Sequence, residues 1–121
     1  MSGYHDLEIY QMAYRLARNV HDMSLTLPKY ELYEQGSQVR RSAQRIKDTI
    51  AEGYGRRRYK EEYIRFLVFA QASCDEVISQ LNMISEIYFP DDPLTELISE
   101  YNVLGAKINK YIQYVENNWK K

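Results

Sequence analysis

The sequence contains a single cysteine and few of the residues that interrupt regular structure. One thiol, Cys74, cannot form a disulfide within the chain or a cysteine-based zinc site, so we expect a reducing compartment and interpret it as a small buried apolar group. Only three prolines and five glycines occur in 121 residues, which leaves little room for flexible linkers. We therefore expect a folded chain and not a disordered one.

Long hydrophobic runs are also missing. No segment approaches the roughly 18 consecutive apolar residues of a membrane span, and Met1–Asp6 lacks the basic flank and apolar core of a signal peptide. The formal net charge is only −1, so the chain as a whole has no electrostatic attraction to nucleic acid. We expect one cytoplasmic domain over residues 1–121, without contact to a membrane.

Apolar residues recur with the helical period of 3.6 along the whole sequence. Four stripes show this spacing: Ile9, Ala13, Leu16, Val20, Met23 and Leu27; Val39, Ala43, Ile46 and Ile50; Tyr63, Phe66, Ala70, Cys74, Val77, Leu81, Ile84 and Tyr88; and Leu94, Leu97, Tyr101, Leu104, Ile108, Tyr111, Val115 and Trp119. No segment of useful length alternates with period two. Because short connections make sequential helices pack antiparallel, the pattern predicts an all-α, up-down-up-down four-helix bundle.

Proline and glycine mark the expected helix ends. Pro28 ends the first helix because the residue before a proline avoids the α region. Gly53-Tyr54-Gly55 is predicted to end the second helix through a glycine in the left-handed conformation. The segment Pro90-Asp91-Asp92-Pro93 predicts a stop and a turn, followed by an Asp92 N-cap and a first-turn Pro93.

Candidate catalytic groups are scarce. The two histidines, His5 and His21, do not form the Glu-x-x-His pattern of a bundle that holds two metals. Cys74 lies within an apolar stripe, without a sequence sign of an activating base. The Gly53-Tyr54-Gly55 segment lacks the strand and the Gly-Lys-Ser/Thr of a phosphate-binding loop. We expect neither an enzyme nor a metal or other cofactor.

Positive charge is concentrated in one part of the sequence. Residues 37–65 hold nine basic and four acidic residues, an excess of five positive charges, while the remainder carries a net −6. The candidate nucleic-acid-binding residues are Arg40, Arg41, Arg45, Arg56, Arg57, Arg58 and Lys60. We expect them at one end of the bundle, where guanidinium groups could bind phosphates and Tyr54 or Tyr59 could stack on unpaired bases. The alternative is a solvated face whose arginines pair with carboxylates of the same or a neighbouring subunit.

Tyrosine is abundant, with twelve residues spread over every predicted helix. Tyrosine suits surfaces that are buried but keep a wet edge, as subunit interfaces do. The first helix also carries a second stripe, formed by Leu7, Tyr10, Tyr14 and Ala17, which makes its apolar face wider than one partner helix requires. Both features favour a homo-oligomer.

The end of the second helix resembles a known family signature. Ile50-Ala51-Glu52-Gly53-Tyr54-Gly55-Arg56 is similar to the Asn-Ile-Ala-Glu-Gly motif of the four-helix-bundle proteins encoded in intervening sequences of bacterial 23S ribosomal RNA genes. Further matches run in order over about residues 6–88: Asp6-Leu7, Tyr10, Ala13, Pro28, Glu31, Gln38 to Ala43, Tyr63 to Leu67, Ala70, Ser73 and Glu76. The motif asparagine is Thr49 here.

The resemblance implies an antiparallel bundle that assembles into a ring-like homopentamer. It also implies kinship with the accessory proteins of diversity-generating retroelements, whose basic surfaces bind nucleic acid and a reverse transcriptase. We therefore expect a bacterial, non-enzymatic pentamer that binds structured RNA or DNA, with a reverse transcriptase or a ribosome-related protein as a further partner. The alternative is a protein–protein assembly module without a role in nucleic-acid binding.

Overall fold

The computed structural model describes residues 3–119, and these residues form helices and connecting turns without a β-strand. The four long helices are α1 (Glu8–Ser24), α2 (Gln35–Gly55), α3 (Lys60–Tyr88) and α4 (Thr95–Asn118). Two short 3₁₀ helices, η1 (Tyr4–Asp6) and η2 (Lys29–Tyr33), precede α1 and α2. The all-α prediction is confirmed.

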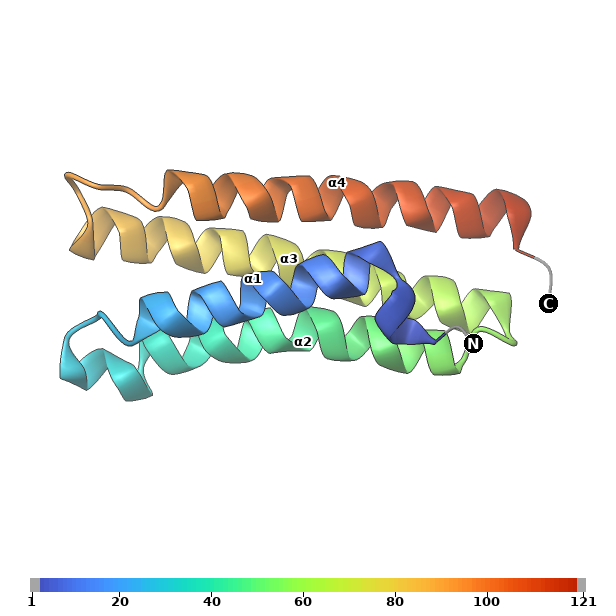
Figure 1. Ribbon diagram of the computed structural model, residues 1–121, viewed down its shortest axis with the longest axis horizontal. Helices are drawn as coiled ribbons and strands as arrows, with labels where there is room; N and C mark the ends of the chain where they lie inside the picture. Colours follow the sequence, from blue (N-terminus) through green and yellow to red (C-terminus); the bar gives the residue numbers. More distant parts are fainter. Residues whose placement is uncertain (1–2, 120–121) are drawn as a thin grey trace.

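The chain runs back and forth along the long axis, so that sequential helices are antiparallel (Figure 1). Consecutive helices pack closely against each other, whereas α1 and α4 contact each other less extensively. The α2–α3 turn lies at the end of the bundle that also holds the first and last described residues (Figure 1). The η2 segment and the α3–α4 connection lie at the opposite end.

The core is formed by the predicted stripes. The four residues of the α2 stripe are fully buried, and most residues of the other three stripes are buried as well. The second stripe of α1 is largely covered within the chain itself, since Ala17 is buried and Leu7 and Tyr10 are partly covered. Only Tyr14 of that stripe remains exposed. This stripe therefore gives weaker support for an oligomer than the sequence suggested.

The end of α2 corrects one prediction. No described glycine has a positive φ, so neither Gly53 nor Gly55 forms a left-handed cap, and α2 continues to Gly55. Gly53 is buried where α2 crosses α3, and a Cβ atom on it would lie 2.7 Å from Cβ of Phe66. The glycine is thus explained by the close approach of two helices.

The start of α4 corrects a second prediction. The helix begins at Thr95, and Leu94 occupies the N-cap position, so Asp92 is not the cap and Pro93 does not lie in the first turn. The backbone N–H of Leu94 donates to Oγ of Ser85 on α3, at 3.1 Å. This bond holds the α3–α4 connection against α3, and the N-cap lies two residues later than the sequence pattern predicted.

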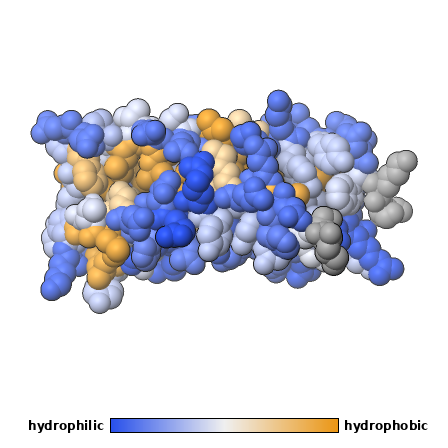
Figure 2. Space-filling model, viewed as in Figure 1, coloured by the Kyte–Doolittle hydropathy of each residue, from blue (hydrophilic) through white to orange (hydrophobic). Residues whose placement is uncertain are grey.

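The surface is mixed in polarity. On the face shown in Figure 2, apolar groups gather toward the end that holds the η2 segment, and polar groups cover most of the other half. Leu25, near the end of α1, is 57% exposed and contributes to the apolar surface at that end of the bundle. No helix among residues 3–119 combines the length and the hydropathy needed to cross a membrane.

Candidate nucleic-acid interface

The α2–α3 turn has a fixed backbone. The N–H groups of Arg56 and Arg57 donate to the carbonyl oxygens of Gly53 and Tyr54, at 2.9 and 3.2 Å. The N–H of Tyr59 then donates to the carbonyl of Arg56, at 2.9 Å. Because these bonds satisfy the backbone groups that the end of α2 leaves free, the turn follows directly from the helix.

The end of α4 and the residue that follows it contact the α2–α3 turn. The indole Nε1 of Trp119 donates to the carbonyl of Arg57 at 3.0 Å. The ammonium group of Lys60 donates to the carbonyl of Glu116 at 2.7 Å, so its charge lies at the C-terminal end of a helix, where it is favourable. Neither contact is predictable from the sequence, because both depend on the register of α4 against α3.

A cluster of aromatic rings lies beneath the turn. Tyr63 is buried and packs edge-on against the rings of Tyr54, Tyr111 and Trp119, at centroid distances of 6.2, 6.0 and 5.3 Å. Its hydroxyl is 2.9 Å from that of Tyr111. Burial, with this hydrogen bond as a second cause, raises the pKa of Tyr63 far above its usual value. The charged turn therefore packs on a cluster of uncharged aromatic side chains.

Two arginines of the turn lie against aromatic rings. The guanidinium of Arg57 is 4.0 Å from the ring centroid of Tyr54 and also donates to the Tyr54 carbonyl at 2.9 Å. The guanidinium of Arg58 is 5.9 Å from the ring of Tyr59, which is 63% exposed. Within residues 3–119, neither arginine has a carboxylate within 4 Å. Both positive charges are thus available to an external anion.

Arg56 and Arg45 differ from Arg57 and Arg58 because they lie close to carboxylates. Arg56 lies 3.6 Å from a carboxylate oxygen of Glu52 and 3.7 Å from one of Glu62, and Arg45 lies 3.5 Å from one of Glu76. These pairs are exposed, so each contributes little stability. They do reduce the positive charge that the two arginines present to a phosphate.

Arg40 and Arg41 lie near the other end of α2. Arg40 donates to Oγ of Ser24 at 2.9 Å and to the carbonyl of Leu32 at 2.8 Å, so it ties α2 to the α1–α2 connection. Arg41 donates to Oγ of Ser37 at 2.6 Å. Sixteen residues separate Arg40 from Arg56, roughly 24 Å along a helix. The prediction that all seven basic residues gather at one end is therefore wrong for one subunit.

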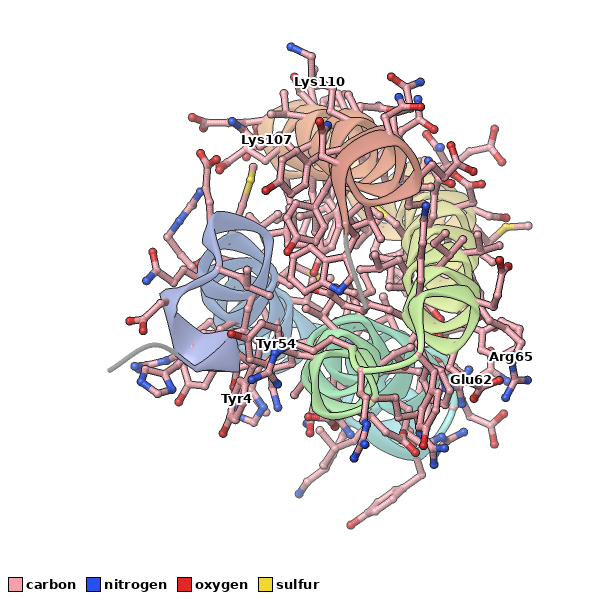
Figure 3. The ribbon with its side chains drawn as sticks, turned by 90° about the vertical axis from the view of Figure 1, so that its right-hand side faces the viewer. Tyr4, Tyr54, Glu62, Arg65, Lys107 and Lys110 are labelled. Atoms are coloured by element: carbon pink, nitrogen blue, oxygen red, sulfur yellow. The ribbon has the colours of Figure 1, made fainter. Side chains whose placement is uncertain are left out.

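A groove between α2 and α3 extends from the turn. It has a volume of about 590 Å³, and its walls include Arg41, Arg45, Asp48, Glu52 and Phe69. Arg65 donates two hydrogen bonds to the carboxylate of Glu62, at 3.1 and 3.2 Å (Figure 3). Its guanidinium also lies 5.4 Å from the centroid of the Phe69 ring. The charges of this groove balance each other, so it attracts phosphate less than the turn does.

A second groove lies between α1 and α4, which contact each other less extensively than consecutive helices do. It has a volume of about 480 Å³ and is lined by Leu7, Glu8, Ile9, Lys107, Lys110, Tyr111 and Tyr114. The two lysines lie on α4, on the far side of the bundle from α2 (Figure 3). Lys107 pairs with Glu8 at 3.0 Å.

The Cys74 thiol is not available as a nucleophile. Cys74 is fully buried and its thiol donates to the carbonyl of Tyr101 at 3.2 Å. Burial raises the pKa of the thiol to about 12, so it remains protonated at neutral pH. No set of three or more His, Cys, Asp or Glu side chains among residues 3–119 could hold a metal ion.

These observations define the class of protein: an all-helical four-helix bundle with a cationic, aromatic turn at one end. Residues 5–110 match the family model described as 23S rRNA-intervening sequence protein. The chain belongs to this family, as its Ile50–Arg56 motif indicated. A search of curated proteins finds no match.

Proposed function

We propose that this protein is a non-enzymatic homopentamer that binds RNA or DNA through the α2–α3 turn. The observation that carries the proposal is that Arg57 and Arg58 are not paired with carboxylates. Their guanidinium groups lie over tyrosine rings instead. Guanidinium groups of this kind bind phosphates with little regard to sequence. The family description, 23S rRNA-intervening sequence protein, makes RNA the first ligand to test.

Assembly would increase the local charge. One subunit has a net charge of −1 and only two unpaired arginines at the turn, which is a weak attraction for a polyanion. Five subunits with their α2–α3 turns around one axis would bring ten such guanidiniums to one face of a ring. Charges focused in this way raise both the local concentration and the association rate of an anionic ligand.

The test is the salt dependence of binding. We expect labelled RNA hairpins and duplex DNA to bind at low salt, with an affinity that falls as salt rises because bound counterions are released. Arg57→Ala/Arg58→Ala should lower the slope of log K against log salt by about 1.8 per subunit that contacts a duplex, since each phosphate contact contributes about 0.9.

The matched control removes two positive charges from α1. Arg15→Ala/Arg18→Ala changes the net charge equally, but at exposed positions away from the turn. Absence of binding by the wild type at low salt would refute the proposed function. An equal loss in both double variants would show that net charge, and not the turn, governs binding.

An assembly module without nucleic-acid binding is the second candidate. It is favoured by the outer face of α3, where Val68, Phe69, Met83 and Ile87 are each 46–52% exposed. The carboxylate pairs of Arg45 and Arg56 also fit this alternative, in which the basic residues serve only to hold the surface together. A reverse transcriptase or a ribosome-related protein would then bind to the assembled ring.

A further inference from the structure

We infer that the α2–α3 turn prefers unpaired nucleotides to duplexes, with the ring of Tyr59 stacking on a base while Arg57 and Arg58 bind the adjoining phosphates. This inference rests on the proposed function and names the class of nucleic acid that the turn accepts.

Tyr59 is presented to solvent by a backbone that is fixed on both sides. Its N–H donates to the carbonyl of Arg56, and its carbonyl accepts from the N–H of Tyr63 at 3.0 Å, in the first turn of α3. The ring itself is 63% exposed, although a tyrosine ring is largely apolar. An exposed ring on a rigid turn loses little conformational entropy when a base stacks on it.

The neighbouring cations are also held in place. Arg57 is anchored by its bond to the Tyr54 carbonyl and by the Tyr54 ring, and Arg58 lies close to the Tyr59 ring. Three consecutive residues thus offer one free aromatic face and two unpaired guanidiniums within a single turn. This combination of stacking platform and positive charge is typical of sites for single-stranded nucleic acid.

A duplex uses such a site poorly. Its bases are already stacked on each other, so only its phosphates are accessible to Arg57 and Arg58 and the Tyr59 ring gains no partner. An unpaired nucleotide in a loop, bulge or free strand can turn its base onto the ring and keep the phosphate contacts. The turn should therefore prefer unpaired segments by the contribution of one stacked base.

The experiment compares a labelled unstructured single-stranded RNA with a duplex of equal length at one low salt concentration. We expect the wild type to bind the single strand more tightly. Tyr59→Ala should lower the affinity for the single strand about tenfold, within the range found for loss of one stacked base, and leave the affinity for the duplex unchanged. Tyr59→Phe keeps the ring and should retain the preference.

Tyr33→Ala is the matched control. Tyr33 is 82% exposed and lies in η2 at the opposite end of the bundle, so its loss should change neither affinity. Equal effects of Tyr59→Ala on both nucleic acids, or none on either, overturn this inference while the proposed function stands. Failure of the wild type to bind either probe refutes the proposed function itself.

Discussion

Glu31, a single carboxylate that is only 5% exposed, connects two helices of the bundle. Its Oε1 accepts from the backbone N–H of Gln35 and its Oε2 from the side chain of Gln35, both at 3.1 Å. The hydroxyl of Tyr88, at the end of α3, donates to the same carboxylate. Glu31 therefore satisfies the first free N–H of α2 from outside the helix and links the start of α2 to the end of α3.

This network predicts a pH dependence of stability. The hydrogen bond from Tyr88 is the main reason why the pKa of Glu31 lies below its usual value of 4.5, with the bonds from Gln35 as further causes. The folded state therefore binds the proton more weakly than the unfolded state does. The resulting stability is present above about pH 4.5 and is lost as the pH falls through the lowered pKa.

Glu31→Gln removes this contribution, since an amide does not titrate. We expect the variant to melt below the wild type at pH 7, and the difference in Tm to shrink as the pH falls from 4.5 toward 3. Thermal unfolding followed by circular dichroism measures this, with the exposed neighbour Glu34→Gln as the control. A difference in Tm that is constant over this range would contradict the role of Glu31.

The sequence does not distinguish the roles of Arg40 and Arg57. Both arginines belong to the same basic stretch, and both were predicted to bind nucleic acid. Arg40 binds Ser24 and the carbonyl of Leu32, whereas Arg57 lies on the surface against Tyr54. The hydrogen bonds of Arg40 depend on the path of the α1–α2 connection, which helical periodicity does not specify.

The close approach of α2 and α3 is the main feature at the scale of the elements. Small side chains, Ser42 and Ala43 on α2 and Ala70 and Ser73 on α3, are buried between helices or against the core. Gly53 continues this pattern to the end of α2, where it faces Phe66. Small residues at such positions let two helix backbones approach closely.

Gly53 and Gly55 form a matched pair for a test. Gly53→Ala places a Cβ at 2.7 Å from Cβ of Phe66, so α2 and α3 must shift, and we expect a loss of about 1–3 kcal/mol in the free energy of unfolding. A Cβ on Gly55 meets nothing within 4 Å. Because φ is not positive there, Gly55→Ala should be neutral or stabilise by up to about 1 kcal/mol.

Urea denaturation of the two variants measures both values. Equal effects at the two positions would contradict the packing role of Gly53. A gain in stability for both would show that helix propensity outweighs the crowding.

Helices themselves were predictable because their apolar stripes follow the 3.6 period over many turns. The α2 stripe, from Val39 to Ile50, is buried at every position that the spacing indicated. Helix ends were less predictable. The cap proposed at Asp92 is replaced by a bond from Leu94 to Ser85, a residue of another helix that local sequence cannot reveal.

At the scale of the whole molecule, the outer face of α3 carries four half-exposed apolar side chains. Val68, Phe69, Met83 and Ile87 lie on one face by the helical period, and each remains about half exposed. Covering the exposed half of one such side chain contributes about 1 kcal/mol. The proposed assembly would gain from burying this face.

Phe69→Glu/Met83→Glu tests that role. We expect the wild type to elute as an oligomer and the variant as a monomer, because a carboxylate buried at an interface without a partner is unfavourable. Light scattering coupled to size-exclusion chromatography gives the mass. The control, Val103→Glu, changes a residue of α4 that is 45% exposed.

An oligomer that persists in the α3 variant would place the interface elsewhere. A wild type that is monomeric at every concentration would refute assembly altogether. Unchanged circular dichroism of the variant is required for either conclusion, and both substituted side chains are exposed enough for the fold to tolerate them.

The arrangement of the chain ends has a practical consequence for handling this protein. The first and last described residues lie at the same end as the α2–α3 turn (Figure 1), and Trp119 contacts the turn directly. A purification tag or fluorescent fusion joined close to Trp119 would crowd Tyr59 and its neighbouring arginines. Dyes for binding measurements are better attached to a cysteine introduced near Glu34, some 30 Å away along α2.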